Sequence, residues 1–153
     1  MQKKLLKNKK ILIISSTAFL IVFFDQLTKF FIVKHFKVSQ SLPILNNIFH
    51  LTFVKNTGAG FGILKGFSPF LILISLAVIG IIFYYYKQIK QNQILLQTIA
   101  AFVLGGTIGN LIDRINLGYV IDFLDFRIWP VFNIADSFVT IGIIGLVIYF
   151  WRD

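Results

Sequence analysis

The chain contains no cysteine, and histidine occurs only twice, at His35 and His50. Without cysteine, disulfide bonds, thiolate metal ligands and a cysteine nucleophile are all excluded. Two histidines leave very little material for a histidine-based metal site or for a Ser-His-Asp triad. The residues therefore give no reason to expect a metal or any other cofactor.

Acidic residues are also scarce, because the chain has no glutamate and only six aspartates. Half of these aspartates lie in the apolar stretch "VIDFLDFRIWPVFNIADSF", as Asp122, Asp125 and Asp136. Ionised carboxylates are costly in apolar surroundings. The stretch therefore raises the question of whether these three are solvated surface groups or are held there for chemistry.

Apolar residues are abundant: 57% of the 153 residues are hydrophobic, including 18 phenylalanines. This share exceeds that of ordinary soluble domains and predicts an α-helical integral membrane protein. The formal net charge is +9, but the lysines gather at the ends of apolar runs rather than on one polar face. The positive charge therefore favours contact with membrane lipids over binding to nucleic acid.

Four apolar segments approach the roughly 20 residues that a helix needs to cross a bilayer core of about 30 Å. The predicted transmembrane spans are 11–33, 67–86, 94–112 and 134–151, with extracytoplasmic segments at 34–66 and 113–133. The first span lacks a small-x-small cleavage pattern and is interpreted as uncleaved. We expect a single membrane domain over residues 1–153.

Charge at the start of the chain predicts its orientation in the membrane. The five lysines that precede the first span favour a cytoplasmic amino terminus, and they are Lys3, Lys4, Lys7, Lys9 and Lys10. An even number of spans then returns the carboxyl terminus to the same side.

In the first outer segment, "IFHLTFV" alternates large apolar residues with His50, Thr52 and Val54, a period of two that predicts a half-buried strand.

The polar residues of the predicted spans gather at the outer ends of those spans. They are Asp25, Lys29, Asn110, Asp113, Arg114, Asn133 and Asp136. A single polar layer at the outer face suits a site that acts at the membrane interface. It does not suit an ion pathway, which needs polar steps through the full depth of the membrane. A proton- or cation-coupled membrane transporter subunit is therefore the alternative rather than the leading hypothesis.

Several of these residues also have ordinary structural explanations. Asn133 and Asp136 can begin a helix, as its cap and its first-turn acid. Asp25 and Lys29 are four residues apart on one helix face and can form a buried ion pair. The glycines of "GGTIG" have the spacing of a close helix contact. None of these explanations covers Asp122, which stands among apolar neighbours with no adjacent cation or cap.

Asp122 and Asp136 together suit amide hydrolysis without a metal, a serine or a cysteine. One carboxyl group activates water as a base, while the other protonates the carbonyl oxygen or the departing amine. Two such groups brought close share a proton, and their titrations separate. A helix start favours the anion of Asp136, and apolar neighbours favour the neutral acid of Asp122. Asp136 is therefore expected to be the more acidic member of the pair.

Five motifs are similar to the sequence blocks of the type II, or lipoprotein, signal peptidases, in order and over nearly the whole chain. They are "DQLTK" (25–29), "NTGAGFG" (56–62), "GNLIDR" (109–114), "VIDF" (120–123) and "FNIAD" (132–136). Gly60, where some relatives have alanine, and the short loop between the last two spans are mild variations. Asp125 fits none of the blocks and is expected to be a surface or loop residue.

The resemblance implies an aspartic endopeptidase, signal peptidase II, with four transmembrane helices and a small extracytoplasmic β-sheet. It implies a monomeric multi-pass protein of a bacterial-type cytoplasmic (inner) membrane, with both termini cytoplasmic and the active site at the outer face. Its substrates are prolipoproteins, which lose their signal peptide just before a diacylglyceryl-modified cysteine. Asp122 and Asp136 become the catalytic pair. Supporting or substrate-binding roles are implied for Asp25, Lys29, Asn56, Gly58, Asn110, Asp113, Arg114, Asn133 and Ala135.

Overall fold

The computed structural model describes residues 2–59 and 64–151, with side chains from residue 9 onward. It contains four helices, α1 (Gln2–His35), α2 (Ser68–Tyr85), α3 (Ile94–Leu117) and α4 (Ile134–Trp151). A three-stranded sheet comprises β1 (Ser41–Leu45), β2 (Phe49–Asn56) and β3 (Val120–Asp125). All four helices are long and apolar enough to cross a membrane. The predicted fold class is therefore confirmed.

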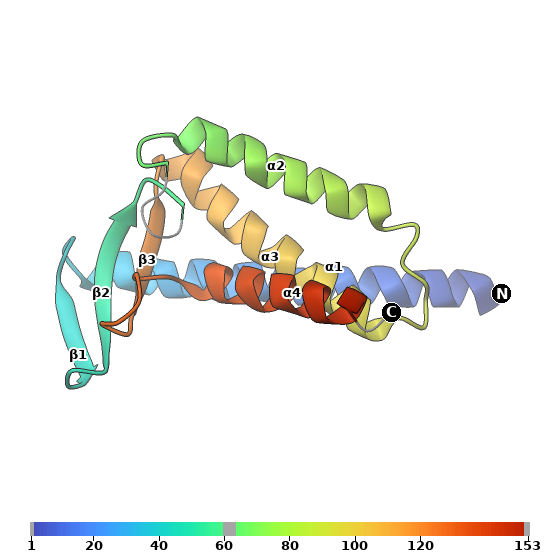
Figure 1. Ribbon diagram of the computed structural model, residues 1–153, viewed down its shortest axis with the longest axis horizontal. Helices are drawn as coiled ribbons and strands as arrows, with labels where there is room; N and C mark the ends of the chain where they lie inside the picture. The colour runs from blue at the N-terminus through green and yellow to red at the C-terminus, as the bar shows by residue number, and fades with distance from the viewer. Residues whose placement is uncertain (1, 60–63, 152–153) are drawn as a thin grey trace.

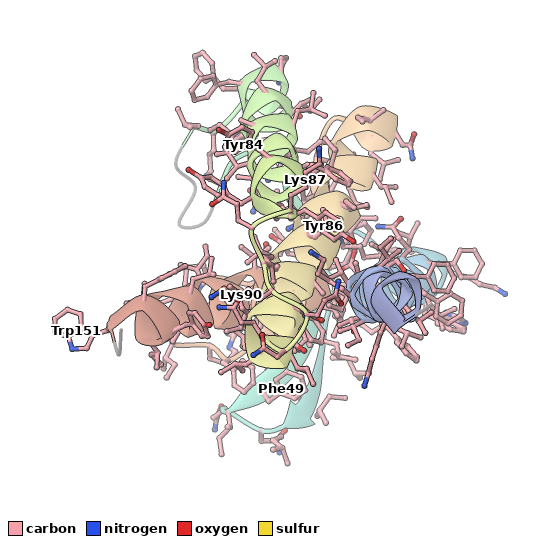
Figure 2. All side chains as sticks on the ribbon, turned by 90° about the vertical axis from the view of Figure 1, so that its right-hand side faces the viewer. Phe49, Tyr84, Tyr86, Lys87, Lys90 and Trp151 are labelled. Atoms are coloured by element: carbon pink, nitrogen blue, oxygen red, sulfur yellow. The ribbon has the colours of Figure 1, made fainter. Side chains whose placement is uncertain are left out.

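The helices are arranged around α3, which packs against each of the other three. Figure 2 looks along the long axis and shows α1, α2 and α4 on different sides of this central helix. The sheet lies at one end of the bundle, and both chain ends lie toward the other (Figure 1). This relative placement of sheet and termini is the one that an even number of membrane crossings produces.

Small residues allow the neighbouring helices to approach α3 closely. A Cβ atom on Gly105 would lie 2.9 Å from the carbonyl oxygen of Ala18 in α1. A Cβ atom on Gly106 would meet the carbonyl oxygen of Ala135 and would lie 2.7 Å from Cγ2 of Val139 in α4. The "GGTIG" segment is therefore confirmed as a close helix contact on two sides.

The sheet is antiparallel in the order β1-β2-β3, and one apolar cluster attaches it to the end of α1. The cluster is formed by Ile32, Phe53, Ile121 and Phe123. The strand that alternation predicted is β2. By contrast, β3 has no such alternation, because five of its six residues are buried, so both of its faces are covered. The residues alone therefore did not reveal β3.

Helix α3 continues to Leu117, five residues beyond the predicted end of the span at residue 112. It ends at Gly118, whose positive φ of 79° forms a left-handed C-cap. The predicted span stops just before Asp113 and Arg114, which are charged. In the structure Asp113 faces the protein interior, where it has polar partners, so the helix does not need to stop there.

The close contact between α3 and α4 makes Gly106 a sensitive position. We expect Gly106→Ala to lower the free energy of unfolding by about 1–3 kcal/mol, because the added methyl overpacks the interface. A Cβ atom on Gly80 in α2 would meet no neighbouring group within 4 Å, so Gly80→Ala is the matched control. The control should be neutral or stabilising by roughly 0.5–1 kcal/mol. Thermal transitions of both purified variants in detergent measure this; equal transitions would contradict the packing argument.

Candidate active site

Asp122 lies on β3 at the end of the bundle that carries the sheet, and its side chain is buried, with 1% of the residue exposed. Its two carboxylate oxygens accept hydrogen bonds from two asparagines. Asn133 Nδ2 donates to Oδ1 at 2.7 Å, and Asn56 Nδ2 donates to Oδ2 at 2.9 Å. The apolar neighbours seen in the sequence therefore enclose a carboxylate whose polar partners come from distant segments.

Asp136 lies in the first turn of α4, where it forms a reciprocal cap with Asn133. The backbone N–H of Asp136 donates to Asn133 Oδ1 at 2.8 Å, and the backbone N–H of Asn133 donates to Asp136 Oδ2 at 3.3 Å. The other oxygen, Asp136 Oδ1, accepts from Asn110 Nδ2 at 2.7 Å. The helix-start explanation is therefore correct, and it fixes the orientation of this carboxylate at the same time.

Asn133 connects the two aspartates directly. It caps Asp136 through its oxygen and backbone, and it donates to Asp122 through its side-chain nitrogen. The same nitrogen also lies 3.0 Å from Asn110 Oδ1, so the two amides join α3 to the start of α4. Asn133 is fully buried, which shields these bonds from competition with water.

On the other side of Asn110 from Asp136, the ammonium group of Lys29 lies among three acceptors. Lys29 Nζ is 2.8 Å from Asp25 Oδ2, 2.9 Å from Asp113 Oδ2 and 3.1 Å from Asn110 Oδ1. The predicted Asp25–Lys29 ion pair is therefore confirmed, and Asp113 extends it from α1 to α3. Asp25 Oδ1 also accepts the backbone N–H of Ala135 at 2.9 Å, which brings the start of α4 into the same cluster.

Three hydrogen bonds in this cluster were not anticipated from the sequence. Gln26 Nε2 donates to Asp113 Oδ1 at 2.9 Å and to the carbonyl of Gly109 at 3.1 Å. Asp113 Oδ2 accepts the backbone N–H of Ile121 at 3.0 Å, which fixes β3 one residue before Asp122. Gln26 lies inside the "DQLTK" block, and that position is the only signal that the sequence offered.

Burial and the neighbouring charge of Asp136 raise the pKa of Asp122 to about 7, against the opposing hydrogen bonds from Asn56 and Asn133. Asp122 therefore changes its protonation state near neutral pH, as expected of a group that moves a proton. This agrees with the expectation that the surroundings of Asp122 favour its neutral acid.

Both aspartates line a cleft of about 880 Å³. Its walls combine polar groups from the β2 end and α3 with apolar residues from the β3–α4 loop and α4, including Asn56, Arg114, Trp129, Phe132, Val139 and Ile141. Gly58 contacts two of the lining residues: its N–H donates to Asn56 Oδ1 at 2.9 Å, and its carbonyl is 3.4 Å from Arg114 Nη2. Residues 60–62 of the "NTGAGFG" block, Gly60 among them, lie outside the described residues.

The expectation that Asp125 is a surface or loop residue is wrong. Asp125 is the last residue of β3 and is only 5% exposed. Its partners are Thr52, which the sequence marked only as a residue of the predicted strand, and Arg127, which no motif singled out. Burial raises the pKa of Asp125, but the hydrogen bonds from Thr52 and Arg127 outweigh it and hold the pKa below its usual range. Asp125 is absent from the residues that line the cleft.

Lys29 should be essential for folding, because it neutralises two buried carboxylates. We expect Lys29→Met to lower the free energy of unfolding by about 3–5 kcal/mol, since Asp25 and Asp113 lose their shared cation. Lys55→Met is the control, because Lys55 is an exposed residue whose ammonium group lies over the Tyr119 ring. The control should change stability by less than about 1 kcal/mol. Thermal unfolding in one detergent measures both, and a Lys29 variant as stable as the control would refute the assignment.

Comparisons with known proteins agree with one another. The model of a family described as signal peptidase (SPase) II matches residues 17–152. The lipoprotein signal peptidase of Halothermothrix orenii is 48% identical over 135 residues, which cover 88% of this chain and 92% of that protein. The lipoprotein signal peptidase of Moorella thermoacetica is 44% identical over 129 residues, which cover 84% of this chain and 86% of that protein.

Solved structures show the same similarity in three dimensions. A bacterial membrane enzyme determined by the in meso method superposes with a TM-score of 0.86 at 34% sequence identity, covering 95% of this chain and 89% of the other. A second structure of this description gives a TM-score of 0.82, also at 34% identity. The likeness therefore extends over the helices and the sheet together.

Proposed function

The chain belongs to the signal peptidase II family, and we propose that it is an intramembrane aspartyl endopeptidase that removes the signal peptide from prolipoproteins. Cleavage takes place just before the diacylglyceryl-modified cysteine. The observation that carries the proposal is the bridge by Asn133, which bonds both Asp122 and Asp136 at the wall of one cleft. Two linked carboxyl groups beside a cleft provide the base and the acid that amide hydrolysis requires.

In the resting enzyme we assign one shared proton to the pair and place it on Asp122. The pKa of Asp122 is raised to about 7 by burial and by the charge of Asp136. Asp136, in contrast, lies at the positive end of the α4 dipole and accepts two N–H groups, which stabilises its anion. Asp136 is then the base and Asp122 the acid in the first step.

The proposed reaction proceeds in two steps. Asp136 takes a proton from a water molecule, the hydroxide adds to the scissile carbonyl carbon, and Asp122 gives its proton to the carbonyl oxygen. The tetrahedral diol then returns a proton to Asp122, while Asp136 donates its proton to the amine nitrogen and the C–N bond breaks. The products are a carboxyl terminus on the signal peptide and a free amino group on the lipid-modified cysteine, and the pair regains its resting protonation.

The location of the cleft supports a substrate that arrives through the membrane. Val139 and Ile141 of α4 line the cleft, and Ile143 and Ile144 continue the same helix with exposed apolar side chains. A lipid-anchored substrate diffuses in the plane of the bilayer, so its acyl chains can follow α4 while its peptide reaches the aspartates. We propose a monomer in a bacterial cytoplasmic membrane, with both termini cytoplasmic and the cleft at the outer face.

A proton- or cation-coupled transporter subunit remains the alternative, and the polar groups at the inner end of the described bundle argue against it. Lys10 Nζ donates to the carbonyls of Tyr86 and Ile89, and Gln97 Nε2 donates to the carbonyl of Lys90. These groups thus hold the inner loop rather than extend a path from the aspartates. Reconstitution distinguishes the two: transport gives flux across sealed vesicles without a peptide product, and the peptidase gives the product without flux.

Substitution of single aspartates tests the catalytic pair. We expect Asp122→Asn and Asp136→Asn each to lower prolipoprotein cleavage by on the order of 100- to 10,000-fold, because asparagine cannot accept or donate the transferred proton. Asp125→Asn, the matched control, should retain most activity in detergent, because Asp125 does not line the cleft. Cleavage is measured with purified protein whose folding is verified by its thermal transition. Substantial cleavage by a folded Asp122 or Asp136 variant would falsify the mechanism.

The shared proton also predicts the pH dependence of cleavage. As pH rises through about 7, the pKa of Asp122, the pair loses its proton and activity should fall. At low pH both carboxyl groups are protonated, no base remains, and activity should fall again. The rate plotted against pH should therefore be bell-shaped with its alkaline limb near pH 7. A rate that keeps rising up to pH 9 in a folded enzyme would contradict a protonated acid in the pair.

A further inference from the structure

Asp125 forms a clamp at the junction between β3 and the loop that leads to α4. Its Oδ2 accepts a hydrogen bond from Thr52 Oγ1 at 2.7 Å and forms an ion pair with Arg127 Nη1 at 3.0 Å. Its Oδ1 accepts the backbone N–H of Arg127 at 2.9 Å. Neither Thr52 nor Arg127 lines the cleft. The bonds of this buried carboxylate therefore take no direct part in chemistry at the aspartate pair.

The clamp holds a tight turn in an unfavourable backbone conformation. Arg127 has a φ of 65°, in the left-handed region that non-glycine residues rarely adopt, and Asp125 bonds both its backbone and its side chain. The turn places two large apolar side chains outside the fold. Ile128 is 94% exposed, and Trp129 is 57% exposed while also lining the cleft. Such exposure is costly in water.

Aromatic contacts fix this turn to the hairpin that joins β1 and β2. The Phe126 ring lies 4.9 Å from the ring of Phe49 and 5.9 Å from that of Phe132, between centroids. Beside Phe49, the hairpin turn exposes two further apolar residues, Leu45 and Ile48. We call Leu45, Ile48, Ile128 and Trp129 together the seating surface.

The position of the seating surface indicates what covers it. The strands run across the ends of the helices, and the β1–β2 hairpin extends beyond the outline of the bundle (Figure 1). In the end-on view, Phe49 projects on the opposite side of α3 from Tyr84 of α2 (Figure 2). Helix α4, which exposes apolar side chains along its length, begins at Ile134, five residues after Trp129. The hairpin therefore extends past the helices, over the space that lipid fills around a membrane-spanning bundle, and the Phe126–Phe49 contact keeps the turn beside it.

We propose that the seating surface inserts into the outer leaflet of the membrane, and that Asp125 is the positioning residue that holds it there through Thr52 and Arg127. Tryptophan is favoured at this depth, because its ring is apolar and its N–H can reach the polar interface. The insertion itself does not depend on the catalytic proposal. If that proposal also holds, Trp129 places the mouth of the cleft at the level where a diacylglyceryl group meets its peptide.

The chain has two tryptophans, so Trp151→Phe leaves Trp129 as the single tryptophan, whose emission is excited selectively over that of the tyrosines. The protein is reconstituted in phosphatidylcholine vesicles that contain lipids with a doxyl quencher either near the headgroup or deep in the acyl chain. We expect stronger quenching of Trp129 by the shallow label than by the deep one, and weak quenching by iodide in the water. Strong iodide quenching without doxyl quenching would place the turn in water and overturn the proposal.

Variants in this single-tryptophan background test the clamp. Ile128→Ser and Asp125→Asn should each reduce shallow doxyl quenching by at least about twofold, whereas Ile128→Leu should retain it. Thr52→Val and Arg127→Gln remove the side-chain partners of Asp125 instead, and they test the clamp if the Asp125 variant does not fold. Unchanged quenching in the folded clamp variants would overturn the role of Asp125. Prolipoprotein cleavage in detergent should persist in Ile128→Ser, so a failure of catalysis and a failure of seating are distinguishable.

Discussion

The ammonium group of Lys29 is the point on which the half of the molecule next to the sheet depends. A lone cation at this depth would be strongly unfavourable, and so would Asp25 or Asp113 without it. Together they form a compact set of charge-assisted bonds that draws α1 and α3 together, and Asp25 adds the first turn of α4. The Gly109 position illustrates how tight this junction is, because a Cβ atom there would lie 2.7 Å from Asp25 Oδ2.

The layer that holds the proposed catalytic aspartates is built on this junction through amides rather than through further charges. Asn110 accepts from Lys29 on one side and donates to Asp136 on the other, so it links the ion cluster to the proposed reaction centre. Asn133 donates to Asp122 through its side-chain nitrogen, while its side-chain oxygen caps the start of α4. A structural explanation of Asn133 is therefore compatible with the proposed catalytic one, since the cap that begins α4 also orients the Asp136 carboxylate.

Local patterns in the sequence predicted the parts of the molecule that local physics controls. Hydropathy marked the helices, the four-residue spacing of Asp25 and Lys29 marked their pair, and alternation marked β2. The rest depends on distant partners. A strand buried on both faces has no alternation, so β3 was missed. The third predicted span stopped short of Asp113, whose acceptor role for Ile121 lies across the fold. Asp125 was misjudged for the same reason, because Thr52 lies on another strand.

Helix α2 differs from its neighbours because none of its described side chains forms a hydrogen bond with the cluster around Lys29. Its buried Ser75 bonds only to the carbonyl of Leu71 in its own helix. It packs chiefly on α3 through apolar side chains. Bilayers differ in thickness, and a transmembrane helix such as α2, with 18 residues, adapts to a thinner bilayer by tilting and to a thicker one by thinning the lipid around it. Since α1, α3 and α4 are joined by the buried charges and α2 is not, α2 can absorb hydrophobic mismatch while the geometry of the two aspartates stays constant.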